Sequence, residues 1–174
     1  MHWRLKQTNL LDEPADVLVC SANVSLNLSG GVGAELLGRY GDRMQKSLHA
    51  ILHQRSPRAA KCGEVFAYSG KEMPYKAVLH AMAIDGWYQS SPQIITDITR
   101  KALKMAAEFE ARKVAFTVLA TGFGNLSLAD FAQGVRPILN DEFPPVEEVI
   151  FGLLLDFQVA ELAKHFPELE TCSV

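Results

Sequence analysis

A chain of 174 residues is long enough for one domain with a substantial core, and its 48% apolar and 21% charged content are typical of a folded globular protein. A formal net charge of −3 argues against a broad basic surface, so no sequence-specific nucleic-acid binding is expected. The longest apolar run, residues 149–155, is far too short to span a membrane.

The start of the chain and its cysteines predict a cytoplasmic protein. Met1 is followed by no apolar run, so no secretory signal is visible. Cys20, Cys62 and Cys172 are odd in number and form no C-x-x-C pair, as is typical of reduced thiols. We therefore predict neither a disulfide framework nor a metal site, and no cofactor.

The first third of the chain predicts two strands, a glycine-rich turn and a long helix. Residues 3–7 alternate apolar and polar side chains, and residues 16–20 have the pattern of a strand buried on both faces. Gly30, Gly31 and Gly33 then lead into apolar residues at helical spacing over about residues 34–54. Unpaired N–H groups and the helix dipole favour an anion at such a helix start. Since no Lys or Arg lies between residues 21 and 35, backbone amides alone would bind it.

Strands and helices alternate along the rest of the chain. The predicted strands cover residues 64–68, 77–82, 114–119 and 149–155, and the predicted helices begin near residues 92 and 128 and cover residues 157–166. The pair Ser91–Pro92 has the pattern of an N-cap followed by proline in the first helical turn. Ser127 and Asp130 have the spacing of a capping box, with Asp in place of the usual Glu.

This alternation predicts an α/β fold in which helices cover both faces of a largely parallel sheet. The chain shows no repeat or linker, so residues 1–174 are expected to form a single domain. In such sheets, ligands bind outside the carboxyl ends of the strands. The glycine turns at residues 30–33 and 120–125 both follow a strand and precede a helix, so together they could hold a diphosphate.

Two common phosphate-binding motifs fit the glycine turns poorly. A P-loop requires Gly-Lys-Ser/Thr, but the chain's Gly70–Lys71 pair is followed by Glu72. The dinucleotide-binding pattern G-x-G-x-x-G lacks its third glycine in both turns.

An ordered set of short motifs resembles the macrodomain family instead. The set comprises ADVLV at residues 15–19, SAN at 21–23, GGV at 30–32, GEV at 63–65, VLHA at 78–81 and ATGFGNLS at 120–127. The resemblance covers about residues 5–166. It implies a three-layer α/β/α sandwich with a mixed, largely parallel six-stranded sheet that binds ADP-ribose or an ADP-ribosylated macromolecule.

The resemblance also implies a set of ligand contacts. Asn23 would face the distal ribose and is the best candidate for a catalytic role, while Asn9 and Phe157 would lie near the adenine and Leu10 would be a further ligand contact. The residues implied around the diphosphate are Gly30, Gly31, Val32 and Gly33 on one side and Thr121, Gly122, Phe123, Gly124 and Asn125 on the other.

Three departures from the family pattern bear on activity. Asn9 replaces an Asp that usually accepts a hydrogen bond from adenine, so the bond should be weaker. Cys20 stands where an Asn usually begins an N-A-A-N run, and Gly33 stands where many hydrolases of the family carry an Asp. Without a visible general base, the sequence favours a protein that binds ADP-ribose. The first alternative is a hydrolase of ADP-ribosyl esters or O-acetyl-ADP-ribose. The second alternative is an interaction module with a vestigial pocket.

The same residues also have plain structural interpretations. Both glycine turns could be ordinary connections between strand and helix, and Asn23 could satisfy backbone groups of its own turn. Phe157 could belong to the core and Asn9 to a solvated loop. His80 lies in an apolar strand and is expected to be a core histidine.

Overall fold

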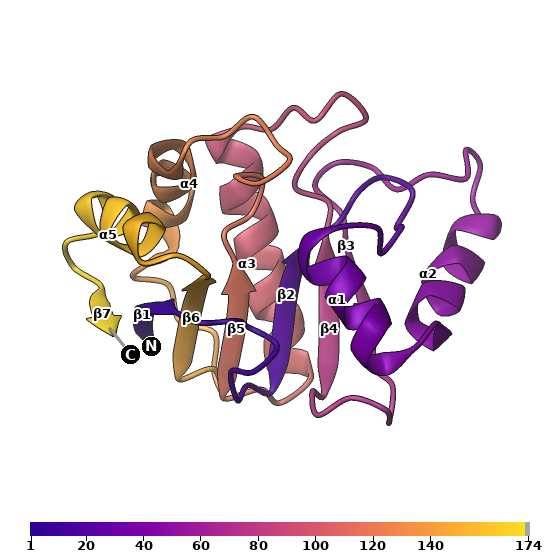
Figure 1. The fold of residues 1–174 in the computed structure, drawn as a ribbon, viewed down its shortest axis with the longest axis horizontal. Coiled ribbons are helices and arrows are strands. Elements are labelled where there is room, and N and C mark those ends of the chain that lie inside the picture. Colours follow the sequence, from indigo (N-terminus) through magenta and orange to yellow (C-terminus); the bar gives the residue numbers. More distant parts are fainter. Residues whose placement is uncertain (173–174) are drawn as a thin grey trace.

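One sheet of seven strands forms the centre of the computed structural model, which describes residues 1–172 (Figure 1). The strands are β1 (His2–Gln7), β2 (Val17–Ser21), β3 (Val65–Tyr68), β4 (Ala77–Ala81), β5 (Lys113–Thr117), β6 (Glu148–Leu153) and β7 (Glu170–Cys172). They are arranged in the order β3-β4-β2-β5-β6-β1-β7. The β3–β4 pair is antiparallel and the other pairs are parallel.

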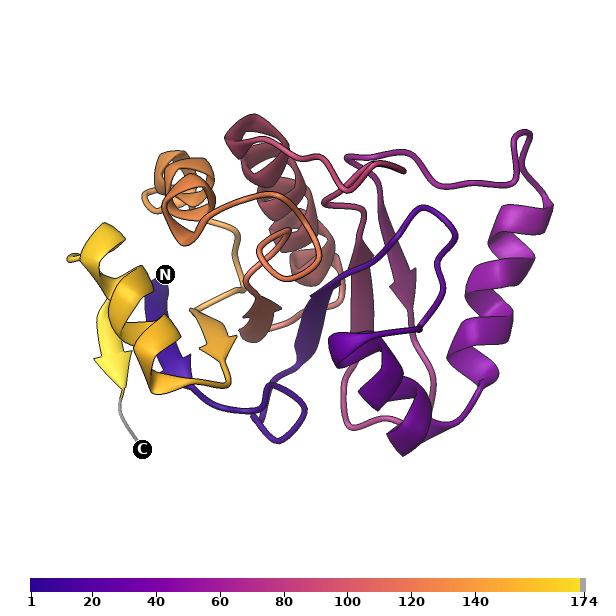
Figure 2. The ribbon, with the colours of Figure 1, turned by 45° about the horizontal axis from the view of Figure 1, so that its top comes forward.

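Helices cover both faces of this sheet, which confirms the predicted three-layer α/β/α architecture (Figure 2). One face carries α1 (Gly31–Tyr40) and α2 (Arg43–His53). The other carries α3 (Pro92–Glu108), α4 (Leu128–Val135) with the short 3-10 helix η1 (Arg136–Ile138), and α5 (Asp156–His165). Within residues 1–172, none of these helices is both long and apolar enough to cross a bilayer.

The two layers of helices enclose two hydrophobic cores, and β2 contributes to both. Val17 and Val19 pack into the core beneath α3, α4 and α5, whereas Leu18 and Cys20 pack into the core beneath α1 and α2. All four side chains are buried. Full burial of each Val or Leu is worth about 1.5–3 kcal/mol, so this alternation fixes the strand in the centre of the sheet.

Two features differ from the sequence-based expectations. The helix predicted over residues 34–54 is two helices, because Gly41 adopts a φ of +76° and ends α1. Leu36 of α1 and Met44 and Leu48 of α2 still share one core, which is why their spacing resembles that of one helix. The sheet has seven strands instead of six because β7 pairs with β1 at its edge.

The parallel arrangement places the carboxyl ends of β4, β2 and β5 next to one another. These neighbouring strands end at Ala81, Ser21 and Thr117 (Figure 1). The segments that follow them, including both glycine turns, therefore begin at one edge of the sheet.

Candidate functional site

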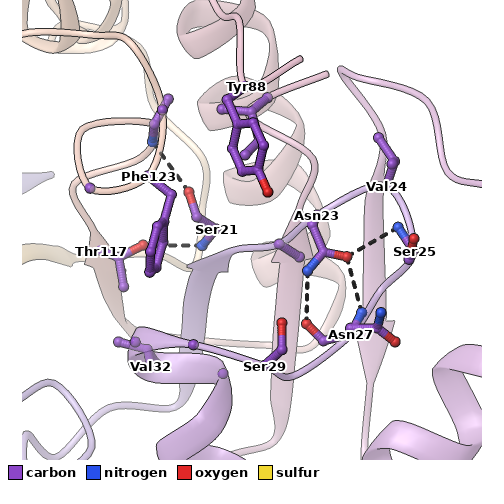
Figure 3. A pocket seen from close by; sticks show the side chains of 18 of the residues that line it. Ser21, Asn23, Val24, Ser25, Asn27, Ser29, Val32, Tyr88, Thr117 and Phe123 are labelled. Carbon is purple, nitrogen blue, oxygen red and sulfur yellow. Dashed lines mark hydrogen bonds between the residues drawn. The ribbon is translucent and has the colours of Figure 1, made fainter. Parts of the chain in front are cut away.

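A cavity of about 640 Å³ lies at this edge of the sheet (Figure 3). Its walls come from the segments 21–33 after β2, 84–88 after β4 and 117–124 at the end of β5, within which Leu26, Trp87, Leu119 and Thr121 do not line it. Pockets for small molecules usually measure about 300–1,000 Å³, so the cavity is large enough for a nucleotide-sized ligand.

The first glycine loop forms the start of α1. Gly30 is the N-cap residue of this helix, and its carbonyl oxygen accepts a hydrogen bond from the Gly33 amide at 3.1 Å. In the part of the chain that the structure describes, the amides of Gly31 and Val32 have no acceptor, and both residues line the cavity. Gly31 has a φ of +50°, a conformation that favours glycine. The loop thus offers an anion two free donors and the positive end of the helix dipole.

The second glycine loop follows β5 and is closed by a hydrogen bond from the Leu126 amide to the Ala120 carbonyl oxygen at 3.2 Å. A Cβ atom on Gly124 would lie 2.3 Å from that oxygen, so only glycine fits. Among residues 1–172, no acceptor is present for the amides of residues 121–125. This loop therefore offers a second series of uncharged donors.

The two glycine loops meet at the cavity. The Phe123 ring lies 3.2 Å from the position that a Cβ atom on Gly30 would take, and it stands above Val32 in Figure 3. The strand ends beneath are joined as well. The Ser21 hydroxyl accepts a hydrogen bond from the Ala120 amide, and the Ser21 amide donates one to the Thr117 hydroxyl, both at 3.2 Å. A single ligand in the cavity can therefore contact both loops.

Asn23 lines the cavity and organises its own loop. Its Oδ1 accepts hydrogen bonds from the Ser25 amide at 3.1 Å and the Asn27 amide at 3.2 Å, and its Nδ2 donates to the Asn27 carbonyl oxygen at 3.0 Å (Figure 3). These bonds match the plain turn interpretation. Because Nδ2 carries two hydrogens, Asn23 keeps one donor for a ligand.

Gln45 of α2 supports the same loop through two hydrogen bonds. Its Oε1 accepts from the Leu28 amide at 2.7 Å, and its Nε2 donates to the Leu26 carbonyl oxygen at 2.8 Å. These two bonds hold the main chain on both sides of Asn27, at a place where Leu26 has a φ of +52°.

The sequence did not single out Asp85, although it lines the cavity in the loop that follows β4. Its Oδ1 accepts from the amides of Trp87 at 2.8 Å and Gln89 at 2.9 Å, which folds the segment into a tight turn. Tyr88, with a φ of +62°, directs its hydroxyl into the cavity (Figure 3). Among the described residues that line the cavity, Asp85 is the one charged side chain.

Thr121 and Asn125 belong to the second loop but do not line the cavity. The Thr121 hydroxyl donates to the Val118 carbonyl oxygen at 2.8 Å. Asn125 braces the Asp85 turn, because its Oδ1 accepts from the Ser90 amide at 2.8 Å and its Nδ2 donates to Gln89 Oε1 at 3.2 Å.

Three further residues implied as ligand contacts, Asn9, Leu10 and Phe157, lie after β1 and β6, outside the lining of the cavity. Asn9 donates through Nδ2 to Glu35 Oε1 of α1 at 2.8 Å and accepts from the Leu11 amide at 3.1 Å. Leu10 is buried and packs over Gly152. Phe157 is 63% exposed, so it is not a core residue, and Leu154 and Leu155 beside it in sequence are also exposed.

His80 is a core residue, as predicted, and its ring does not reach the cavity. Its Nδ1 lies 3.5 Å from Cys20 Sγ. Burial lowers the pKa of His80 to about 4 and raises the pKa of Cys20 to about 12, so both groups are neutral at pH 7.

The sequence profile of the Macro domain family matches residues 19–135, which is more than half of the chain. The protein therefore belongs to the macro domain family. A relative described as a macro domain-containing protein in the non 5′ region of Streptomyces griseus is 28% identical over 152 residues, which is 86% of each chain.

Solved macrodomain structures share the fold. A mutant Oceanobacillus iheyensis macrodomain with ADPR superimposes with a TM-score of 0.81 at 19% identity, covering 94% of this chain and 91% of the other. A Trypanosoma brucei macrodomain in complex with ADP-ribose gives a TM-score of 0.73 at 20% identity, covering 94% of this chain and 68% of the other.

Proposed function

We propose that the protein binds ADP-ribose, free or attached to a macromolecule, and acts chiefly as a reader of this group. The observation that carries the proposal is that two glycine loops with unpaired amides line one cavity. Membership of the macro domain family and the ADP-ribose complex of a neighbour with the same fold support the choice of ligand.

In this proposal, the free backbone amides of the two glycine loops, at residues 30–33 and 121–125, bind the diphosphate. Hydrogen bonds from amides to charged phosphate oxygens contribute roughly 1.5–3 kcal/mol each. A few such bonds, together with burial of the adenine, are compatible with micromolar binding, about −8 kcal/mol.

The same proposal orients the ligand along the edge of the sheet. Asn23 would donate its free Nδ2 hydrogen to the distal ribose. The adenine would lie towards the ends of β6 and β1, where Asn9 and the exposed Phe157 are found. The Asn9 Oδ1 that bonds to the Leu11 amide has a second lone pair for the adenine amino group.

Calorimetric titration with ADP-ribose tests the proposal, and α1 offers a matched pair of variants. Gly31 and Gly38 are both exposed and have open space around an added side chain, but only Gly31 lines the cavity. Because Gly31 has a positive φ that strains any added side chain, Gly31→Gln is the control for that strain. We expect Gly31→Glu to abolish binding, Gly31→Gln to weaken it less because it adds no negative charge, and Gly38→Glu to bind like the wild type. Absence of heat with wild-type protein at millimolar ADP-ribose would refute the proposal.

Hydrolysis of an ADP-ribosyl ester or of O-acetyl-ADP-ribose is the second candidate function, and Asp85 is the observation that favours it. This residue lines the cavity, and its carboxylate could activate water as a general base. If the protein is a hydrolase, Asp85→Asn should lower kcat by about 10²-fold or more. Tight binding of O-acetyl-ADP-ribose without turnover would argue against this candidate and leave the reader function in place.

A further inference from the structure

The lining of the cavity carries an unusual distribution of charge. Among the described residues of its lining, there is no Lys, Arg or His, and Asp85 alone carries a charge. The glycine loops offer neutral amides to an anion, whereas the loop after β4 adds one acidic residue to the lining.

Aromatic rings accompany this carboxylate. Trp87 is 80% exposed and Tyr88 is 56% exposed, although large aromatic side chains are usually well buried. In the second glycine loop, which also lines the cavity, Phe123 is 76% exposed. Isolated exposed aromatics are unremarkable, but here three of them lie on two loops that border one cavity.

Hydrogen bonds hold the loop that carries Asp85 and Tyr88 in a defined conformation. Asp85 Oδ1 bonds to two amides of its own turn, and Asn125 ties the end of this turn to the second glycine loop. Within residues 1–172, Asp85 Oδ2 has no hydrogen-bond partner. The turn thus combines one free carboxylate oxygen with two exposed aromatic side chains, those of Trp87 and Tyr88.

We propose that this turn recognises a cationic side chain, above all the guanidinium of arginine, in the peptide that carries the ADP-ribose. The inference rests on the proposed function and specifies the class of macromolecule that is read. A guanidinium can pair with a carboxylate and stack on an aromatic face at the same time, which suits Asp85 together with Tyr88 and Trp87.

The same features disfavour nucleic acid as the carrier. Its phosphates need Lys or Arg contacts, which the described lining of the cavity lacks, and they would be repelled by Asp85 and by the net charge of −3. The aromatic rings alone would suit unpaired bases, so the carboxylate is the observation that decides between the two carriers.

Two synthetic peptides test the inference. Both carry ADP-ribose on the same serine, and they differ only in having arginine or citrulline on either side of it. We expect wild-type protein to bind the arginine peptide about three- to tenfold more tightly, the range of an exposed ion pair combined with a cation–π contact. The preference should weaken at high salt.

Two variants of the turn and a surface control complete the experiment. Asp85→Asn keeps an oxygen for the two amides of the turn but removes the charge, so the preference should fall below about twofold. Tyr88→Asn accommodates the positive φ and should reduce the preference in part. Asp97→Asn, at an exposed position of α3 away from the cavity, should retain it. Melting temperatures will show that each variant is folded.

The possible failures can be told apart. If wild-type protein binds neither peptide nor free ADP-ribose, the proposed function fails and the inference fails with it. If it binds free ADP-ribose but does not distinguish the peptides, or if an ADP-ribosylated oligonucleotide binds more tightly than the arginine peptide, only the inference is overturned.

Discussion

Individual residues around the cavity adopt backbone conformations that cost energy. Leu26, Tyr88 and Ala120 have φ values of +52°, +62° and +61°, and each lies in a different loop around the cavity. Such conformations in non-glycine residues cost of the order of 1–3 kcal/mol. They persist because neighbouring groups hold them: Gln45 bonds to the Leu26 carbonyl oxygen, and Ser21 bonds to the Ala120 amide. The concentration of strain here supports this edge of the sheet as the functional site.

The second glycine loop provides a residue-scale prediction. In Gly124→Ala the new methyl group would lie 2.3 Å from the Ala120 carbonyl oxygen, and this backbone atom cannot move without opening the loop. We expect the variant to lose about 1–3 kcal/mol of unfolding free energy. Its melting temperature would fall by about 2–4 °C per kcal/mol.

Gly122→Ala is the matched control, because no atom lies within 4 Å of the added methyl group. We expect its unfolding free energy to stay within about 0.5 kcal/mol of the wild type. Equal stability of the two alanine variants would show that the loop does not need glycine at position 124.

At the residue scale, the sequence could identify the glycine loops but not the roles of single polar side chains. It left Asn23 open between a ligand contact and a turn residue, and the structure shows that the side chain makes turn bonds while keeping one donor free. Asp85 was missed because one carboxylate in a polar loop has no distinctive pattern. Its place at the cavity follows from the order of the sheet, in which β4 ends beside β2.

At the scale of elements, the sequence predicted helices and strands correctly wherever local signals and tertiary packing agree. The capping box at Ser127 and Asp130 is confirmed, with hydrogen bonds in both directions at the start of α4. The break between α1 and α2 was missed because the apolar spacing continues across Gly41. β7 was missed because a strand of three residues is too short to show a period.

The two glycine loops together predict weak salt dependence of ADP-ribose binding. The described lining of the cavity contains no side-chain cation, so the diphosphate forms no ion pair there that added salt would screen. We expect the Kd to change by less than about threefold between 50 and 500 mM NaCl, in contrast to the steep loss seen when several Lys or Arg residues bind phosphates. Calorimetry at four salt concentrations would measure this. A loss of tenfold or more would indicate that cationic side chains take part.

On the scale of the whole molecule, the core that supports the cavity contains a buried polar pair. Cys20 of β2 and His80 of β4 are neighbours in the sheet, and both face the core beneath α1 and α2. His80 is fully buried, and its Nε2 has no partner among the described residues. Such a group is held neutral by the fold, so protonation and unfolding must be linked.

This linkage predicts that acid destabilises the protein through His80. The ordinary pKa of the group is 6.5, and burial lowers its pKa in the folded state to about 4. As the pH falls from about 6.5 to about 4, the unfolded chain takes up a proton that the folded chain does not, so the free energy of unfolding decreases. At about 1.4 kcal/mol per pKa unit, the loss approaches about 3 kcal/mol. Urea titrations at several pH values would show this slope in wild-type protein and in His53→Leu, an exposed control on α2, but a smaller one in His80→Leu. If His80→Leu loses stability in parallel with the wild type, His80 does not supply the acid sensitivity.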